Sequence, residues 1–324
     1  MNNGSKQYIY ILSCVKDGGI YRYTLNQRGE LEFVDKVVLD SPMYAVTGSQ
    51  KMYVLLRQPF ETDDESGLVS FSLKDGKLND KSDIISTKGV VCCHLCENDG
   101  EVYAANYISG SIIKMPDRLV LHKGNSVNKE RQSSPHAHFV GVTPEGEYIC
   151  AVDLGIDKII LYDKQLNFVS ETLLKPGNGP RHIAFSDCGR YVYCANELSS
   201  TVTVLAYEKG KMRTVNEYST LPDDYCGNNA PAAVRYHKGY VYVSNRGHNS
   251  IACFKAIEDK LDLMDIVDCG GDSPRDFNIL DEHLICANED SDNVTVFALK
   301  GGSLNKLSEI SLKKPLCVVF LQFA

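Results

Sequence analysis

The feature that most constrains this chain is a short, strand-like run of residues that occurs seven times. The copies are IYILS at Ile9, MYVLL at Met52, VYAAN at Val102, YICAV at Tyr148, YVYCAN at Tyr191, YVYVSN at Tyr240 and LICAN at Leu284. Their central positions are 10, 53, 103, 149, 192, 241 and 285, so neighbouring copies lie 43 to 50 residues apart. A repeat of about that length is typical of one blade of a β-propeller.

The clearest unit, residues 180–219, contains four strand-like runs separated by polar or glycine-containing turns. The expected strands are His182–Ser186, Tyr191–Asn196, Thr201–Tyr207 and Met212–Tyr218. No interval between copies carries a helical pattern of apolar residues long enough for a stable helix. The sequence therefore predicts an all-β chain, with residues 1–324 forming a single seven-bladed β-propeller of four antiparallel strands per blade.

A propeller ring must close, because an open ring would leave the apolar faces of its end sheets exposed to water. The last segment, PLCVVFLQFA, is strand-like and follows the seventh copy. We therefore expect the two chain ends to share one sheet, which protects the edges as radial repetition does in propellers.

Composition excludes several classes of partner. The net charge of −8 and the pI near 5.5 argue against nucleic-acid binding over a broad surface, which needs clustered Lys and Arg. No run has the length of a signal peptide or of a membrane span, so we expect a cytoplasmic protein without a membrane partner. Twelve cysteines are present, and those within strand-like runs are expected to be small buried hydrophobes. Cys93 and Cys96 form a CxxC without a second ligand pair, so no metal or other cofactor is expected.

Repetition separates residues that serve every blade from residues that serve one site. An Asn or Asp ends the second strand of five units, at Asn106, Asp153, Asn196, Asn245 and Asn288, and such residues commonly hydrogen-bond within turns. Asn106 is nevertheless retained as a candidate for substrate binding. The position that follows varies freely and includes Glu197 and Arg246, as expected for residues with a specific role.

Because the first two strands of a blade are antiparallel, the start of the first and the end of the second lie at the same rim. The runs CCHLCEN, SPHAHFVGV, GPRHIAF and SPRDFNI lie at strand-one starts. The candidates expected at this rim are His94, His136, His138, Arg181, His182, Glu197, Arg246, His248 and Arg275. A rim rich in cations favours a small anionic ligand, because guanidinium groups bind carboxylate and phosphate in a bidentate manner.

Several of these runs resemble the lactonase family of seven-bladed propellers. GPRH and NELSS in one unit, followed by SNRGH in the next, are specific in combination, and the resemblance covers essentially the whole chain. The family includes 6-phosphogluconolactonases of the cycloisomerase type and is similar in fold to carboxymuconate lactonising enzymes. The resemblance implies an active site at His138, Arg181, Glu197 and Arg246. We expect the substrate pocket to be completed by His94, Asn106, His136, His182, His248 and Arg275.

Hydrolysis of a lactone needs a base for water and a positive charge for the oxyanion, but no metal. Glu197 or His138 is the expected base, and Arg181 and Arg246 are expected to stabilise the oxyanion or hold the substrate. Glu197 could instead form a structural ion pair with one of these arginines. The resemblance implies that the substrate is a small sugar lactone, 6-phosphogluconolactone before others. A muconate-type cycloisomerase and a propeller that binds without catalysis remain as alternatives.

Overall fold

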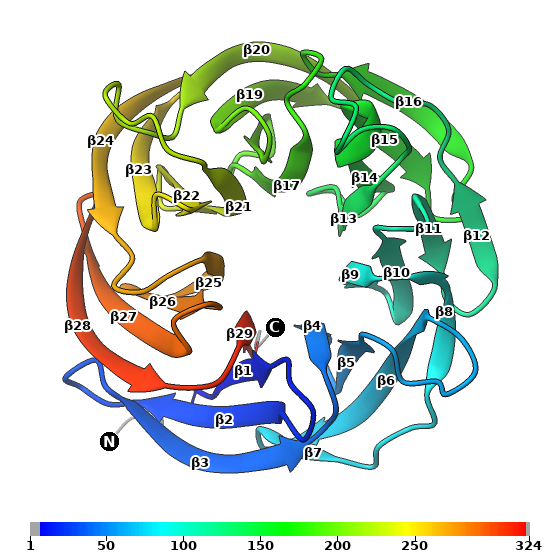
Figure 1. Cartoon of the computed structure of the whole chain (residues 1–324), viewed down its shortest axis with the longest axis vertical. Helices are drawn as coiled ribbons and strands as arrows, with labels where there is room; N and C mark the ends of the chain where they lie inside the picture. Colours follow the sequence, from blue (N-terminus) through cyan, green and yellow to red (C-terminus); the bar gives the residue numbers. More distant parts are fainter. Residues whose placement is uncertain (1–6, 322–324) are drawn as a thin grey trace.

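The computed structural model describes residues 7–321, which form seven antiparallel sheets arranged around a central axis (Figure 1). We number the sheets as blades 1 to 7 in chain order. In blades 3 to 7 the first strand in sequence lies nearest the axis and the others follow outward in sequence order, whereas the innermost strand of blade 1 is β29, from the end of the chain. The predicted seven-bladed propeller is therefore confirmed.

The strands of blades 1 to 3 come from the two ends of the described chain and from its first third. Blade 1 contains β29 (Pro315–Phe320), β1 (Ile9–Ser13), β2 (Gly19–Leu25) and β3 (Leu31–Val38). Blade 2 contains β4 (Pro42–Thr47), β5 (Lys51–Leu56), β6 (Glu65–Lys74), β7 (Lys77–Asn79) and β8 (Ile85–Val90). Blade 3 contains β9 (Cys92–Asn98), β10 (Glu101–Asn106), β11 (Ser111–Lys114) and β12 (Arg118–Leu121).

Blades 4 to 7 follow in order, and each has four strands. Blade 4 contains β13 (Ala137–Val142), β14 (Tyr148–Asp153), β15 (Lys158–Asp163) and β16 (Phe168–Leu173), with the 3-10 turn η1 (Leu154–Ile156) after β14. Blade 5 contains β17 (Pro180–Phe185), β18 (Tyr191–Asn196), β19 (Thr201–Glu208) and β20 (Lys211–Ser219). Blade 6 contains β21 (Ala230–His237), β22 (Tyr240–Arg246), β23 (Ser250–Ile257) and β24 (Lys260–Asp268). Blade 7 contains β25 (Pro274–Leu280), β26 (His283–Asn288), β27 (Asn293–Lys300) and β28 (Ser303–Ser311). No helix of the described chain is long and apolar enough to cross a membrane.

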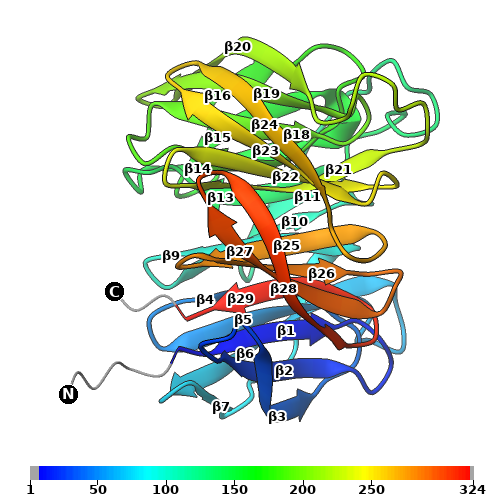
Figure 2. The same cartoon turned by 90° about the vertical axis from the view of Figure 1, so that its left-hand side faces the viewer.

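The ring is closed by strands from opposite ends of the chain, as expected. β29 pairs antiparallel with β1, with Ile9 opposite Phe320 and Tyr10 opposite Val319. The side view shows β1 and β29 next to each other in one sheet (Figure 2). The last three residues of the predicted closing segment, 322–324, lie outside the described residues.

Blade 2 departs from the prediction of four strands per blade. Its outermost strand, β7, has only three residues and pairs with the last part of the ten-residue β6. The first part of β6 would otherwise be an open edge, and β8 pairs with it, with Gly67 opposite Ser86. The fifth strand thus covers an edge that the short β7 leaves unpaired.

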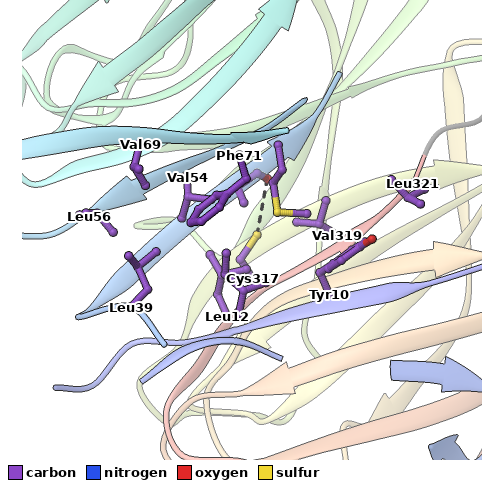
Figure 3. Packing of buried hydrophobic residues seen from close by; sticks show 13 residues of the cluster. Tyr10, Leu12, Leu39, Val54, Leu56, Val69, Phe71, Cys317, Val319 and Leu321 are labelled. Carbon is purple, nitrogen blue, oxygen red and sulfur yellow. Dashed lines mark hydrogen bonds between the residues drawn. The ribbon is translucent and has the colours of Figure 1, made fainter. Parts of the chain in front are cut away.

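The hydrophobic core lies between neighbouring blades, where the faces of two sheets pack together. Between blades 1 and 2, Tyr10 and Leu12 of β1 pack with Val54 of β5 and Phe71 of β6, all at most 3% exposed (Figure 3). Cys317 of β29 is buried in the same cluster. None of the twelve cysteines forms a disulfide, and seven of them are fully buried, as the strand pattern predicted for this residue type.

An irregularity recurs at the start of the innermost strands and decides what faces the axis. In blade 5, Pro180 is opposite Asn196 and His182 is opposite Ala195, so Arg181 is the extra residue of a β-bulge. The same skip leaves one extra residue in five other blades, at Met43, Cys93, His138, Arg275 and Leu316. In blade 6 the skip contains two residues, Ala232 and Ala233. Bulges redirect side chains, and here they do so at one rim of the ring.

Candidate functional site

All six single-residue bulges line one small cavity on the propeller axis. Its volume is about 20 Å³, and its lining residues are Met43, Tyr44, Cys93, His138, Arg181, His182, Arg275, Asp276 and Leu316. Blades 3, 4, 5 and 7 contribute polar bulge residues, whereas blades 1 and 2 contribute Leu316 and Met43. One arc of the cavity therefore carries the chemically active groups.

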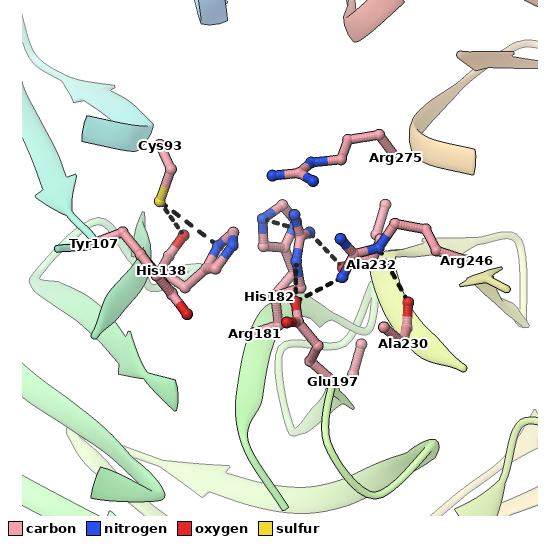
Figure 4. Close-up of polar contacts among 12 residues, drawn as sticks. Cys93, Tyr107, His138, Arg181, His182, Glu197, Ala230, Ala232, Arg246 and Arg275 are labelled. Atoms are coloured by element: carbon pink, nitrogen blue, oxygen red, sulfur yellow. Dashed lines mark hydrogen bonds and ion pairs between the residues drawn. The ribbon is translucent and has the colours of Figure 1, made fainter. Parts of the chain in front are cut away.

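Beside this cavity, Glu197 is held by three arginines, and Figure 4 shows two of them, Arg181 and Arg246. Its Oε2 accepts from Arg181 Nε at 3.0 Å and from Arg246 Nη2 at 2.7 Å. Its Oε1 accepts from Arg131 Nη2 at 2.5 Å. Glu197 follows β18 directly, and its position is fixed by its backbone N–H, which donates to the Gly179 carbonyl at 2.7 Å. Three cations around one carboxylate leave an excess of positive charge.

The excess of positive charge around Glu197 controls the protonation of its carboxyl group. Burial alone would raise the pKa of Glu197, but the charges of Arg246 and Arg181 outweigh it and hold the pKa well below its ordinary value. Glu197 is therefore an ionised carboxylate, and both of its oxygens already accept hydrogen bonds. Burial lowers the pKa of Arg181 to about 9, with Arg246 and Arg275 adding to the effect, so its guanidinium stays charged at neutral pH.

The three arginines predicted at this rim are each held by a backbone carbonyl or a carboxylate of the blades. Arg246, the last residue of β22, donates from Nε to the Ala230 carbonyl at 3.1 Å. Arg181 donates from Nη1 to the Ala232 carbonyl at 2.8 Å, across to blade 6. Arg275 lies 3.3 Å from Glu289 and lines the small cavity. Their guanidinium groups therefore have little freedom to move.

Three imidazoles lie close together on the axis. The ring of His182 is 5.0 Å from that of His94 and 5.3 Å from that of His138, measured between centroids. Burial, with the charge of Arg181 or Arg235 adding to it, lowers the pKa of each ring well below its ordinary value. All three are therefore neutral at physiological pH. The His94 ring contacts the rings of both Tyr44 and Phe139, with centroids 4.3 and 4.2 Å away.

His138 has a thiol neighbour on one side. The Cys93 sulfur lies 3.7 Å from His138 Nδ1 and 3.4 Å from its carbonyl oxygen. Burial raises the pKa of the Cys93 thiol to about 12. The thiol is therefore protonated and is a poor nucleophile, whereas the neutral imidazole beside it can accept a proton.

Two further predicted histidines lie at the edge of the site. His136 stacks on Tyr107 with ring centroids 4.6 Å apart, and its Nδ1 is 3.0 Å from the Tyr107 carbonyl. His248 is half-buried, with Nδ1 2.7 Å from Ser250 Oγ, and its ring meets Tyr225 edge-on. Both are bound to neighbouring residues of their own rim.

Asn106 has a different environment from these groups. It is completely buried, and its Nδ2 donates to the Thr87 carbonyl at 3.0 Å and to Ser111 Oγ at 3.1 Å. Asn245 repeats this arrangement in blade 6, with Thr220 and Ser250. Both residues thus hold the turn after strand two, which is the role that the repeat predicted for this position.

Arg131 is the site residue that the sequence did not indicate. It lies in the segment 122–134, which joins β12 to β13, interrupts the repeat and has no counterpart in the other units. From there it reaches past blade 4 to Glu197 in blade 5 and also donates to Tyr107 Oη at 3.3 Å. The only available signal was a basic residue in an insertion that leads to the active rim.

A larger cavity opens at the opposite mouth of the ring. It has a volume of about 860 Å³, is bordered by Glu97 and Asp281, and shares Tyr44 with the small cavity. No Lys, Arg or His of the described chain lines it. The predicted cations and imidazoles gather at the other mouth, which is therefore the candidate site for an anionic ligand.

The fold and this mouth together define a seven-bladed propeller with a cluster of arginines and neutral histidines at one mouth. Sequence comparison then identifies the family. The model described as "Lactonase, 7-bladed beta-propeller" matches residues 8–320, and the chain belongs to this family.

Similar proteins occur in several bacteria. An uncharacterised protein of Staphylococcus aureus (strain USA300) is 35% identical, with 92% of each chain covered. A structure of a Lactobacillus plantarum protein has a TM-score of 0.89 at 27% identity and covers 98% of this chain and 100% of that one. A candidate 6-phosphogluconolactonase of Bacteroides fragilis has a TM-score of 0.88 at 24% identity, with 99% of each chain covered. The last of these similarities shows the fold alone.

Proposed function

We propose that this protein is a metal-independent lactonase that hydrolyses a sugar lactone, with 6-phosphogluconolactone as its substrate. The observation that carries the proposal is the convergence of Glu197, three arginines and the neutral His138 at one mouth. Membership of the lactonase family supports a lactone as the substrate class. The name of the Bacteroides fragilis structure suggests the phosphorylated lactone, which the cationic mouth suits.

In the proposed mechanism His138 is the base. The neutral imidazole of His138 can accept a proton, whereas both oxygens of Glu197 already accept hydrogen bonds from guanidinium groups. Water attacks the lactone carbonyl carbon while His138 takes the proton of the water. The C=O electron pair moves to the oxygen, and the charge of Arg181 or Arg246 stabilises this oxyanion. The ring C–O bond then breaks, and the protonated His138 returns the proton to the leaving alkoxide.

The small cavity supports a place for the attacking water. A volume of about 20 Å³ is enough for one water molecule. Arg181 Nη1 donates to His182 Nε2 at 3.2 Å, so the proton of the neutral His182 ring lies on Nδ1. That buried Nδ1 has no hydrogen-bond partner among residues 7–321, and His182 lines the cavity. A water molecule there would satisfy it.

A lactonase assay tests the proposal. We expect the protein to accelerate the opening of freshly prepared 6-phosphogluconolactone above the spontaneous rate, with a chelator present. Opening of an unsaturated muconolactone instead would favour the cycloisomerase alternative. The absence of turnover on both would favour a binding protein and contradict the proposal.

Two substitutions in the charged cluster around Glu197 test the proposed mechanism. Glu197→Gln removes the charge that orders three guanidinium groups, and Arg246→Ala removes one of those groups. We expect each to lower kcat/KM by about 100-fold or more, which is the usual effect of losing an oxyanion donor or a proton-transfer group. Circular dichroism should show an intact fold in both, and near-normal turnover of both variants would remove the proposed mechanism.

A further inference from the structure

The guanidinium of Arg131 is placed to bind a ligand group outside the small cavity. Its side chain is 43% exposed, compared with 3% for Arg181 and 15% for Arg246, although all three contact Glu197. Arg131 donates two hydrogen bonds, to Glu197 and to Tyr107, and both come from Nη2. Its Nε and Nη1 have no hydrogen-bond partner within the described chain, so these donors remain available.

The segment that carries Arg131 is held firmly to blade 4. The Gln132 side chain is fully buried, and its Nε2 donates to the Leu154 carbonyl at 2.9 Å. The Ser126 N–H donates to the Gln132 carbonyl at 2.9 Å, and Ser126 Oγ donates to Asp157 Oδ2 at 2.5 Å. Such a segment presents the guanidinium with little loss of conformational entropy when a ligand binds.

Gly155 allows this close contact. A Cβ at this position would lie 2.0 Å from the Ser134 carbonyl oxygen and 2.7 Å from the His136 backbone nitrogen. Any side chain larger than hydrogen would therefore push the segment away from η1. The loop geometry that places Arg131 at the mouth depends on this contact.

The volume of the small cavity limits which part of a ligand can contact Arg131. The cavity of about 20 Å³ admits no more than a water molecule, so a sugar ring must lie above it at the mouth. We expect a ring whose carbonyl lies near Arg181 and His138 to have its exocyclic group at the mouth, where the Arg131 side chain is 43% exposed. Three arginines against the single charge of Glu197 leave positive charge that a second anion can neutralise.

We infer that Arg131 is the residue that selects a phosphorylated ligand, because its guanidinium binds the phosphate group from the rim while Nη2 stays on Glu197. This inference rests on the proposed function, since it specifies the substrate class of the same site. Selectivity is the ratio of the affinity for the phosphorylated ligand to the affinity for its unphosphorylated counterpart. A general disturbance of the site would weaken both and leave this ratio nearly unchanged.

Isothermal titration calorimetry with 6-phosphogluconate and gluconate tests the inference without turnover. We expect the wild type to bind 6-phosphogluconate more tightly, and Arg131→Gln to reduce the ratio of the two affinities by about 10- to 100-fold, the effect of losing charge-assisted hydrogen bonds. Arg131→Lys should restore part of the ratio, since a lysine keeps the charge but not the fork.

Lys129→Gln is the matched control, because Lys129 is an exposed cation of the same segment. It should leave the ratio unchanged. An equal ratio in wild type and Arg131→Gln, or no preference for 6-phosphogluconate in the wild type, would overturn the inference. A preference that depends on Arg131, in a protein that opens no lactone, would support the phosphate site while contradicting the proposed lactonase activity.

Discussion

At the scale of single residues, the environment drives Glu197 and His138 toward the protonation states that the proposed chemistry needs. Arginine charges outweigh burial and keep the carboxyl group ionised, whereas burial keeps the imidazole neutral. The two groups therefore have separate tasks. Glu197 orders the guanidinium groups, and His138 remains free to accept a proton.

The protonation state of His138 makes a prediction for the pH dependence of activity. A base must be unprotonated, and a lowered pKa means that the ring stays unprotonated as the pH falls below its ordinary value of 6.5. We therefore expect the acidic limb of kcat/KM to lie well below pH 6.5. Rates measured from about pH 4 to about pH 8, corrected for spontaneous opening, would show it. A limb at or above pH 6.5 would contradict the assignment of His138.

The sequence predicted much of this residue cluster because its members occupy equivalent places in the repeat. His138, Arg181 and Arg275 are each the second residue of an innermost strand, and Glu197 and Arg246 lie where a second strand ends. Arg131 has no such equivalent, since its segment is absent from the other units. Its contact with Glu197 spans 66 residues of sequence, and no local pattern encodes it.

At the scale of elements, the strands of blade 5 could be predicted more accurately than the way they pair. The second strand is the expected Tyr191–Asn196, and the outer two extend by one or two residues beyond the prediction. The first begins at Pro180 rather than His182, because the bulge at Arg181 lets Pro180 rejoin the ladder opposite Asn196. Bulges depend on register between strands, which a single strand's sequence does not reveal.

The closing strand gives a prediction about stability. All six residues of β29 are buried, and a large buried side chain contributes about 1.5–3 kcal/mol. A chain that ends at Leu312 loses this strand and exposes the inner edge of β1. Because 1 kcal/mol shifts the melting temperature by roughly 2–4 °C in a domain of this size, we expect a decrease of about 10 °C or more.

Thermal unfolding followed by circular dichroism measures this decrease. A chain that ends at Leu321 keeps β29 and is the control, which should melt as the intact protein does. If the chain ending at Leu312 melted at the same temperature as the control, pairing of β29 with β1 would be irrelevant to stability.

At the scale of the whole molecule, the charge is unevenly distributed. The chain carries a net charge of −8, yet the mouth gathers Arg131, Arg181, Arg246 and Arg275 around two carboxylates, Glu197 and Glu289. These arginines give the mouth a local excess of positive charge, which attracts an anion although the whole chain is negative. Salt screens such attraction strongly beyond about 10 Å at 0.1 M ionic strength.

Ionic strength should consequently affect charged and uncharged lactones differently. We expect kcat/KM for 6-phosphogluconolactone to fall by roughly threefold or more between about 10 mM and about 0.5 M salt, since steering of a charged ligand is screened. Unphosphorylated gluconolactone, assayed in the same buffers, should change little. Equal salt dependence of the two substrates would contradict an electrostatic role for the mouth.

The repeat was sufficient to predict the number of blades and the closure of the ring, because both follow from seven similar units. It did not predict the fifth strand of blade 2. β8 pairs with β6 across the irregular part of that unit, where β7 is too short to cover its neighbour. Local insertions thus changed one sheet without changing the circular order of the blades.

The pairing of β29 with β1 also has a consequence for biosynthesis. On a ribosome, β1 to β3 are made before the other blades, but the inner edge of β1 has to wait for β29, whose paired residues are made 302 to 311 positions later, as Ser13↔Pro315 and Ile9↔Phe320 show. Blades 2 to 7 can form one by one as translation proceeds. A nascent chain therefore carries an unmatched β-edge for nearly the whole of its synthesis, and it becomes a finished ring only when the final strand leaves the exit tunnel.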